Sequence, residues 1–281
     1  MKENPAAPPG VRTPKSWLRA SLLPLVLLAL PASRSSASPF TAPDPTLAAA
    51  PAPLAAPPPV APPAQLPAEE QWTAEVLDAQ GEPPKPGLDE LVATVIARHE
   101  GEFPLVDNAL VRTALTKMVG SSTGRRHMRA VLARYRGLSD TVLPALDGAG
   151  LPRELAAVPV LESGYLPSAR DPAGPSGLWM FVPGTAQHFG LRVGSGVDDR
   201  MDPERATDAA ARYFTSLRRR FDDWVLVLAA YNQGHGSIQS VQARHPGADG
   251  WELIRRGAIK DYGARVVAAA FVLDEPRLAE D

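Results

Sequence analysis

The chain has 281 residues, with 29 basic and 31 acidic side chains and a formal net charge of −2 at pH 7. This balance excludes a strongly basic surface, so we predict no nucleic-acid partner. The chain contains no cysteine, which excludes disulfide bonds, thiolate metal sites and a lipid-modified cysteine. Its five histidines show no metal-ligand spacing, so we expect neither a metal nor another cofactor.

Residues 1–38 are predicted to direct export. Lys15 and Arg19 precede a leucine-rich run that is short for a membrane span and is interrupted by Pro24. Small residues follow, and they suit a peptidase site near Ala37. The alternative is an uncleaved anchor in the inner membrane, because signals and anchors share the same physics. Export without cysteine favours the periplasm or envelope of a bacterium.

Residues 39–86 are predicted to form a disordered linker. Up to about residue 68 the segment consists almost wholly of proline, alanine and small polar residues. Such a composition buries too little side chain to offset the entropy lost on ordering, and its prolines favour extended geometry. A function as a proline-motif ligand is disfavoured, because no basic residue lies among these prolines to anchor a partner.

From Leu88 onward the apolar residues recur with helical spacing, and no useful strand alternation appears. We therefore predict an all-α fold, with a helical lead-in at residues 87–150 and a compact domain at residues 151–281. Asp202 as N-cap and Pro203 at the first helical position give the strongest start signal. The expected helices cover residues 88–100, 106–120, two shorter pieces within 125–150, 151–165, 183–190, 202–221, an apolar run from 224, and 262–273.

Glu162 raises the question of function. It follows the apolar run at residues 158–161, within a predicted helix that Pro159 should bend just before the acid. Burial disfavours the charged form of a carboxyl group, and a protonated acid can give its proton to a poor leaving group such as a sugar oxygen. For an isolated glutamate the alternative is a surface residue or one paired with an arginine.

Four segments resemble, in order and spacing, the motif blocks of family 1 lytic transglycosylases, most closely the membrane-bound murein transglycosylase D type. They are residues 154–165, 173–191, 198–217 and 222–238. The resemblance covers roughly residues 105–273 and implies a lysozyme-like helical fold. It also implies cleavage of the β-1,4 bond between N-acetylmuramic acid and N-acetylglucosamine in peptidoglycan, by a protein that we expect to be monomeric.

The resemblance assigns roles by position. Glu162 is implied to be the catalytic acid and base, and Ser163 to contact it or the sugar. The glycan groove is implied to be lined by Gly177, Leu178, Trp179, Met180 and Phe181, and the reacting sugars to be bordered by Tyr231 and Asn232, with Tyr262 near the carboxyl. The loop is rich in glycine, so at least one of Trp179 and Phe181 is expected to face the groove. Trp224 and Phe214 are expected in the core.

Three departures from the family accompany this resemblance. Met180 stands where the family has glutamine, which removes one hydrogen bond to substrate or loop. No glycan-binding repeat follows the catalytic region before Asp281, and the lipid-anchored form requires a cysteine that this chain lacks.

The motif blocks contain one convincing catalytic acid. Asp198, Asp199 and Asp202 lie in a polar turn, where helix capping accounts for at least Asp202. Ordinary glycosidases use two carboxylates, whereas a transglycosylase needs one, because the 6-hydroxyl of muramic acid attacks the anomeric carbon intramolecularly. We therefore expect a 1,6-anhydro product. The alternatives are a hydrolytic lysozyme that uses the same Glu162 and a non-catalytic glycan-binding scaffold, which Met180 favours.

Overall fold

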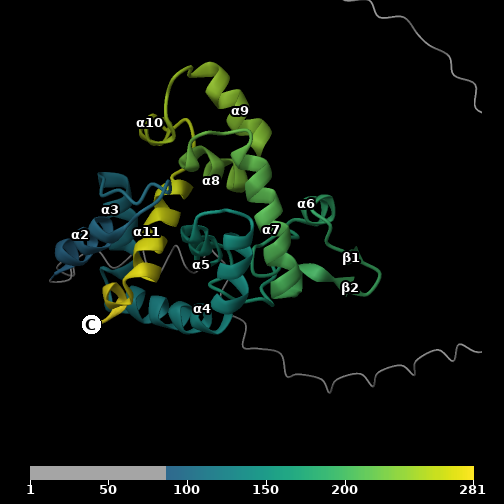
Figure 1. Ribbon diagram of the computed structural model, residues 1–281, viewed down its shortest axis with the longest axis horizontal. Helices are drawn as coiled ribbons and strands as arrows, with labels where there is room; N and C mark the ends of the chain where they lie inside the picture. Colours follow the sequence, from purple (N-terminus) through teal and green to yellow (C-terminus); the bar gives the residue numbers. More distant parts are fainter. Residues whose placement is uncertain (1–86) are drawn as a thin grey trace, which may run out of the picture. The chain divides into compact units, whose positions relative to one another are not determined.

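A computed structural model describes residues 87–281, shown as coloured ribbon in Figure 1. The predicted export signal and linker lie outside the described residues. The helices are α2 (Leu88–Arg98), α3 (Ala109–Val119), α4 (Ser122–Gly148), α5 (Val158–Glu162), α6 (Pro183–His188), α7 (Pro203–Arg218), α8 (Trp224–Gln233), α9 (His235–Arg244), α10 (Gly250–Arg255) and α11 (Tyr262–Asp274). The predicted all-α class is confirmed for this part of the chain.

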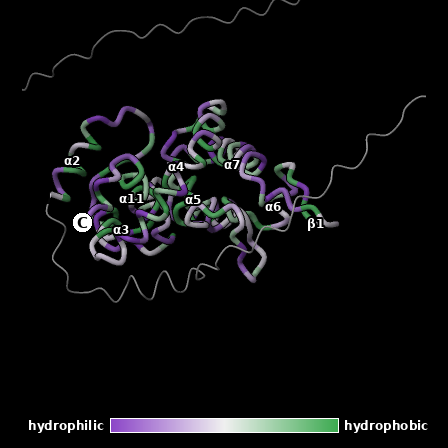
Figure 2. Tube along the Cα trace, turned by 90° about the horizontal axis from the view of Figure 1, so that it is seen from below, coloured by the Kyte–Doolittle hydropathy of each residue, from purple (hydrophilic) through white to green (hydrophobic). Residues whose placement is uncertain are grey.

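Short elements complete the described residues. They are the 3-10 turns η1 (Arg153–Ala157), η2 (Asp199–Met201) and η3 (Pro276–Ala279) and the strands β1 (Val193–Gly194) and β2 (Val197–Asp198). The two strands form an antiparallel hairpin, with Val193 opposite Asp198. Hydrophobic and hydrophilic residues alternate along α4 and α7, as expected where one helix face is buried (Figure 2).

The helix α4 is a correction to the sequence prediction of two shorter helices. It runs unbroken for 27 residues through Gly137, with Pro144 in its C-terminal part. A single glycine costs only about 1 kcal/mol relative to alanine inside a helix, so it does not end one by itself. The buried Met128, Val131 and Leu132 fix one side of α4 against the core. Tertiary packing therefore overrides the local signal at the glycine.

The bent helix predicted over residues 151–165 is also corrected. The segment begins as the 3-10 turn η1 and continues as the five-residue helix α5, which ends at Glu162. Pro159 lies in the first turn of α5, where its missing N–H group leaves no helical hydrogen bond unmade. The proline thus starts the turn that carries Glu162. Residues 158–161 are buried, whereas Glu162 is half-buried.

The helices around the centre begin where their capping residues predict. Asp202 caps α7 by accepting hydrogen bonds from the backbone N–H groups of Glu204 and Arg205, at 3.0 and 3.1 Å. The apolar helix α8 is buried from Trp224 to Ala230. Two helices were not predicted. These are α9, which begins at His235, and α10.

The helix α11 packs closely on α8 and is buried over most of its length. A Cβ atom at Gly263 would come within 2.9 Å of the Val225 side chain, so only glycine allows this approach between the two helices. The close packing sets the position of Tyr262, the first residue of α11.

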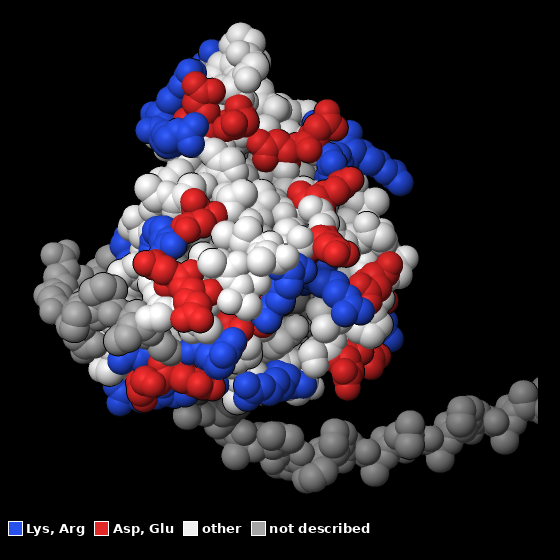
Figure 3. Space-filling view, turned by 60° about the vertical axis from the view of Figure 1, so that its left-hand side comes forward, with Lys and Arg blue, Asp and Glu red and all other residues white. Residues whose placement is uncertain are grey.

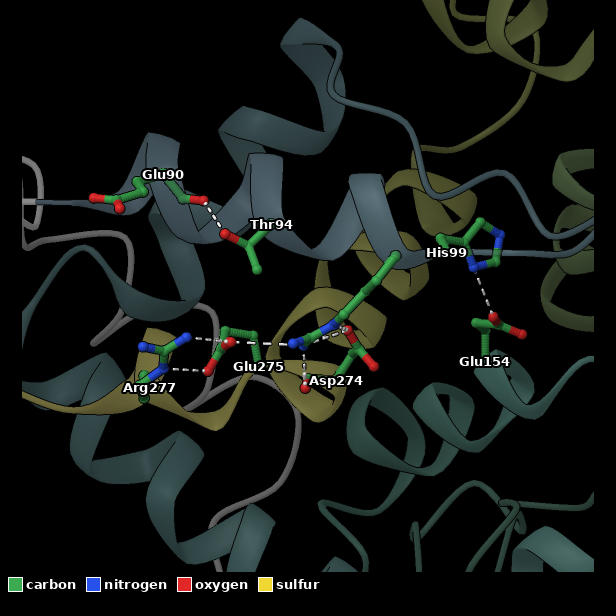
Figure 4. A network of polar contacts seen from close by, with 8 residues as sticks. Glu90, Thr94, His99, Glu154, Asp274, Glu275 and Arg277 are labelled. Carbon is green, nitrogen blue, oxygen red and sulfur yellow. Dashed lines mark hydrogen bonds and ion pairs between the residues drawn. The ribbon is translucent and has the colours of Figure 1, made fainter.

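The lead-in helices hold the segment that follows α11. Arg98 of α2 donates hydrogen bonds to the Asp274 carboxylate at 2.8 and 3.1 Å, and Arg277 pairs with Glu275 beside them (Figure 4). Farther along, the Arg129 guanidinium donates to the Ala279 carbonyl at 2.9 Å. The lead-in at residues 87–150 therefore contacts the end of the chain directly.

Neither the distribution of surface charge nor the length of the apolar helices indicates a particular partner. On the face that Figure 3 shows, acidic and basic side chains are interspersed, and neither sign forms one continuous patch. A membrane-spanning helix must be long and apolar, and none of the helices within residues 87–281 meets that requirement.

The loop between α5 and α6 depends on one glycine. Gly177 has a φ of +84°, and a Cβ atom there would lie 1.8 Å from the Arg200 carbonyl oxygen. The Arg200 guanidinium is buried and donates to the carbonyls of Gly174 and Phe181, at 2.8 and 2.9 Å. The Arg200 side chain thus fixes the loop through hydrogen bonds. The Arg200 backbone leaves no space for a side chain at position 177.

We predict that Gly177→Ala lowers the free energy of unfolding by about 2–5 kcal/mol. The positive φ contributes about 1–2 kcal/mol and the overpacking about 1–3 kcal/mol. Chemical denaturation measures the change. Gly184→Ala, at an exposed position of α6 with open space around its Cβ, is the matched control and should keep or slightly raise stability. Equal effects in both variants would contradict the steric argument.

Candidate active site

Glu162 and Tyr262 form the centre of the candidate site. The Tyr262 hydroxyl donates a hydrogen bond of 2.6 Å to the Glu162 Oε1 atom, across 100 residues of sequence. Burial, followed by the nearby negative charge of Glu162, raises the pKa of the Tyr262 hydroxyl well above its ordinary value. The phenol therefore stays protonated at physiological pH. It can stabilise the carboxylate form of Glu162 as a fixed donor.

Tyr231 lies beside this pair, near the end of α8. Burial and the charge of Glu162 raise the pKa of its hydroxyl well above the ordinary value, so this phenol also stays protonated. The hydroxyl donates to the Trp179 carbonyl at 2.6 Å, and the ring stacks on Phe214 with centroids 4.7 Å apart. The hydrogen bond of Tyr231 thus joins α8 to the loop between α5 and α6.

Ser163 holds the same loop from the other side. Its hydroxyl lies 2.7 Å from the Leu178 carbonyl and 3.3 Å from the Pro159 carbonyl. A hydroxyl has one proton, so the shorter contact is the stronger hydrogen bond. The sequence interpretation placed Ser163 against Glu162 or the sugar, whereas the structure gives its proton to the loop backbone. Two adjacent loop carbonyls, at 178 and 179, are therefore held by hydroxyls from the site.

The loop aromatics correct one expectation. We expected at least one of Trp179 and Phe181 to face the groove, but they are 0% and 3% exposed, and both side chains belong to the core. The Trp179 Nε1 group donates to the Thr207 hydroxyl at 3.0 Å, which satisfies the buried indole. Trp224 and Phe214 lie in the core as predicted.

The other predicted groove residues differ in exposure. Leu178 is fully buried and Gly177 is buried, so neither presents a side chain to a ligand. Met180 is half-buried and has a φ of +47°, while Asn232 is exposed. Among the loop residues at 177–181, Met180 therefore has the most accessible side chain.

The aspartates near the site are occupied by other contacts. Hydrogen bonds from Arg192 lower the pKa of Asp199 from its ordinary value of 3.8 to about 2. Asp198 pairs with Arg200 at 2.8 Å, and Asp202 caps α7 as described above. Asp198 and Asp199 are thus not held as protonated acids at neutral pH, and the Asp202 carboxylate is taken up by the helix cap.

Two contacts around the site have no counterpart in the sequence interpretation. The Gln233 side chain accepts from the Lys260 backbone N–H at 3.4 Å and so links α8 to the segment before Tyr262. Arg134 of α4 donates to the Gly164 carbonyl, two residues after Glu162. Both join segments that are far apart in the sequence, so no local pattern reveals them. Metal binding has no candidate ligand set within residues 87–281.

Comparison with known proteins assigns the central part of the chain. Residues 145–254 match the family described as Transglycosylase SLT domain. The chain is 34% identical over 128 residues to the membrane-bound lytic murein transglycosylase D of Escherichia coli, which covers 44% of this chain and 28% of that protein. The match with the membrane-bound lytic murein transglycosylase F 1 of Alkalilimnicola ehrlichii has 31% identity over 180 residues, 60% of this chain and 33% of the relative.

A solved structure of an inactive mutant of the lytic transglycosylase Slt from Pseudomonas aeruginosa matches with a TM-score of 0.44 and 18% identity, over 74% of this chain and 37% of that one. The chain spans about a third or less of the length of these two curated relatives. The family match and the two curated relatives confirm the resemblance predicted from the motif blocks.

Proposed function

We propose that this chain, which carries a transglycosylase SLT domain at residues 145–254, is a peptidoglycan lytic transglycosylase. It would cleave the β-1,4 bond between N-acetylmuramic acid and N-acetylglucosamine and leave a 1,6-anhydromuramic end. The observation that carries the proposal is the hydrogen bond from Tyr262 to Glu162, since it gives the acid of the family motif a fixed partner.

The reaction needs Glu162 in both protonation states. As an acid, Glu162 gives its proton to the bridging oxygen while the bond from that oxygen to the anomeric carbon breaks. The resulting carboxylate accepts the hydrogen bond from the neutral Tyr262 phenol. The Glu162 carboxylate then takes the proton of the muramic 6-hydroxyl, while the oxygen of this hydroxyl forms a bond to the anomeric carbon. Glu162 is protonated again at the end, and no water is consumed.

The surroundings of Glu162 favour this route over one with two carboxylates. The three aspartates at 198, 199 and 202 are engaged with arginines or a helix N-terminus. An attacking hydroxyl within the same sugar supplies the missing nucleophile with a high effective concentration. A hydrolytic lysozyme with the same Glu162 is the competing enzyme, and a non-catalytic scaffold is the competing binding protein, favoured by Met180 in place of glutamine.

The groove and the location of the protein complete the proposal. Met180 and Asn232 are the groove candidates with accessible side chains. Leu178, Trp179 and Phe181 would contact glycan only through their main chain. The lytic relatives are named as membrane-bound murein enzymes, and the leader at residues 1–38 favours the cell envelope. We infer a periplasmic protein, exported or held by its N-terminal segment, that acts as a monomer through the domain at residues 151–281.

We predict that Glu162→Gln abolishes turnover. The amide keeps the shape of the side chain and an acceptor for Tyr262, but it carries no transferable proton. Loss of a general acid costs up to about ten-thousand-fold, and because the same group also acts as the base, the loss should reach that size or exceed it. Turbidity clearance of purified peptidoglycan measures the rate.

Glu100→Gln, at an exposed glutamate, is the control. Near-normal clearance by Glu162→Gln would overturn the assignment. If the wild type and Glu162→Gln both bound peptidoglycan and neither cleaved it, the scaffold would be favoured.

The products distinguish the two enzymes. We predict that mass spectrometry of the released fragments finds 1,6-anhydromuramic ends, each lighter by one water than a hydrolysed end. Fragments with mainly reducing muramic ends would reject the transglycosylase and favour the lysozyme.

We predict that Tyr262→Phe lowers kcat by about ten- to a hundred-fold. The hydrogen bond to a charged group contributes about 1.5–3 kcal/mol, and 1.36 kcal/mol corresponds to a tenfold change in rate. Kinetics on a defined glycan give the value. Tyr213→Phe is the matched control, at a tyrosine of α7 whose ring packs against Tyr231, and it should keep kcat within about twofold. An unchanged kcat in Tyr262→Phe would show that the carboxylate needs no phenol donor.

A further inference from the structure

The backbone turn that follows Glu162 is unusual. Gly164 and Tyr165 have φ values of +56° and +63°, so two consecutive residues occupy the left-handed region. This region is unfavourable for a residue with a large side chain, and a tyrosine there persists only when its surroundings hold it. The turn directs the chain away from α5 immediately after the acid.

Contacts within the turn account for the tyrosine. The Tyr165 ring is fully buried, and its hydroxyl donates to the Ala156 carbonyl at 2.5 Å. The Tyr165 backbone N–H group donates to the Pro159 carbonyl at 3.1 Å, which closes the C-terminus of α5. The ring also meets the edge of Tyr135 from α4, with centroids 5.2 Å apart.

The helix α4 supplies the other contact. The Arg134 Nε group donates a hydrogen bond of 2.6 Å to the Gly164 carbonyl. Val131, Arg134 and Tyr135 are spaced by three and four residues, so they share one face of α4. That face lies against the turn, because a Cβ atom on Gly164 would be 3.4 Å from the Arg134 guanidinium and 3.8 Å from Val131. Figure 1 shows α4 and α5 as neighbours.

The environment of Arg134 suits a fixed contact. The side chain is half-buried, and burial lowers the pKa of its guanidinium. An arginine nevertheless stays charged at neutral pH. Burial and the charge of Arg134 lower the pKa of the His127 imidazole, which lies two turns away on α4. His127 is therefore neutral near pH 7 and adds no competing positive charge beside the guanidinium.

We propose that Arg134 is a positioning residue for Glu162. Its guanidinium fixes the Gly164 carbonyl on the α4 side, while Tyr262 fixes the carboxylate on the α11 side. The acid is thereby held by two residues, Arg134 and Tyr262, that both lie outside the SLT segment at 145–254. Small displacements of a reacting group can cost about a hundred-fold in rate, so the turn should control kcat. This inference rests on the proposed function.

The test compares Arg134→Ala, Arg134→Lys and Arg136→Ala with the wild type on a defined glycan. Arg134→Ala should lower kcat by about ten- to a hundred-fold and leave KM within about twofold, because the groove itself is unchanged. Millimolar guanidinium or methylguanidinium should restore part of that rate in Arg134→Ala but none in Glu162→Gln. Arg134→Lys should be intermediate. Arg136, exposed on the same helix, is the matched control and should keep the wild-type kcat.

Two outcomes overturn the proposal. One is a wild-type kcat in Arg134→Ala. The other is a loss of rate that follows the folded fraction and is not rescued by guanidinium, which is the signature of a purely structural arginine. If Arg134→Ala does not fold, Arg134→Lys and its kcat-to-KM split decide in its place.

A second measurement separates this proposal from the proposed function. A crystal structure of Arg134→Ala should show the Glu162 carboxylate displaced from Tyr262 or divided between rotamers. An unchanged contact of 2.6 Å would overturn the positioning role even in a protein that cleaves peptidoglycan. If the wild type shows no turnover, the proposed function fails, and the structural comparison alone decides whether Arg134 sets the orientation of Glu162.

Discussion

The site depends on one hydrogen bond, from the phenol of Tyr262 to the carboxylate of Glu162. A half-buried carboxylate is costly unless a donor compensates for its lost hydration. A phenol suits this task because burial keeps it neutral, so it stabilises the charge without becoming a competing acid. The bond also requires the end of α5 to meet the start of α11. That meeting follows from the close packing of α11 on α8 at Gly263, so the core sets the chemistry of the site.

The loop beside the acid obeys a related constraint. Each hydroxyl can donate one proton, and those of Ser163 and Tyr231 are given to the carbonyls of residues 178 and 179. Ser163 and Tyr231 therefore hold the loop backbone in place, and the loop side chains Trp179 and Phe181 are buried in the core. Under the proposed function, a bound glycan would contact mainly fixed backbone and few movable side chains. Such rigidity suits a reaction that depends on alignment.

The sequence predicted those features that have local causes or that the family resemblance implies. The start of α7 at Asp202 and Pro203 follows from capping chemistry, and the pairing of Tyr262 with the acid followed from the family resemblance. The features it missed are decided by tertiary packing. Gly137 resembles a helix end until the buried face of α4 is known, and no local signal tells whether Trp179 turns inward or outward. The helices α9 and α10 are short, and α9 has a weakly amphipathic sequence. The contact of Arg134 with Gly164 spans 30 residues, beyond the reach of any periodicity.

The extent of the functional unit follows from these contacts. The family match at residues 145–254 contains Glu162 but ends before Tyr262, and it begins after Arg134. A chain limited to the match would lose the phenol that faces the carboxylate and the guanidinium that holds the turn. It would also lose α11, whose buried residues form much of the core. The lead-in is tied to the far end of the chain through Arg98 and Arg129. The contacts that hold Glu162 in this geometry therefore extend beyond the family match on both sides, and the lead-in helix α4 supplies one of them.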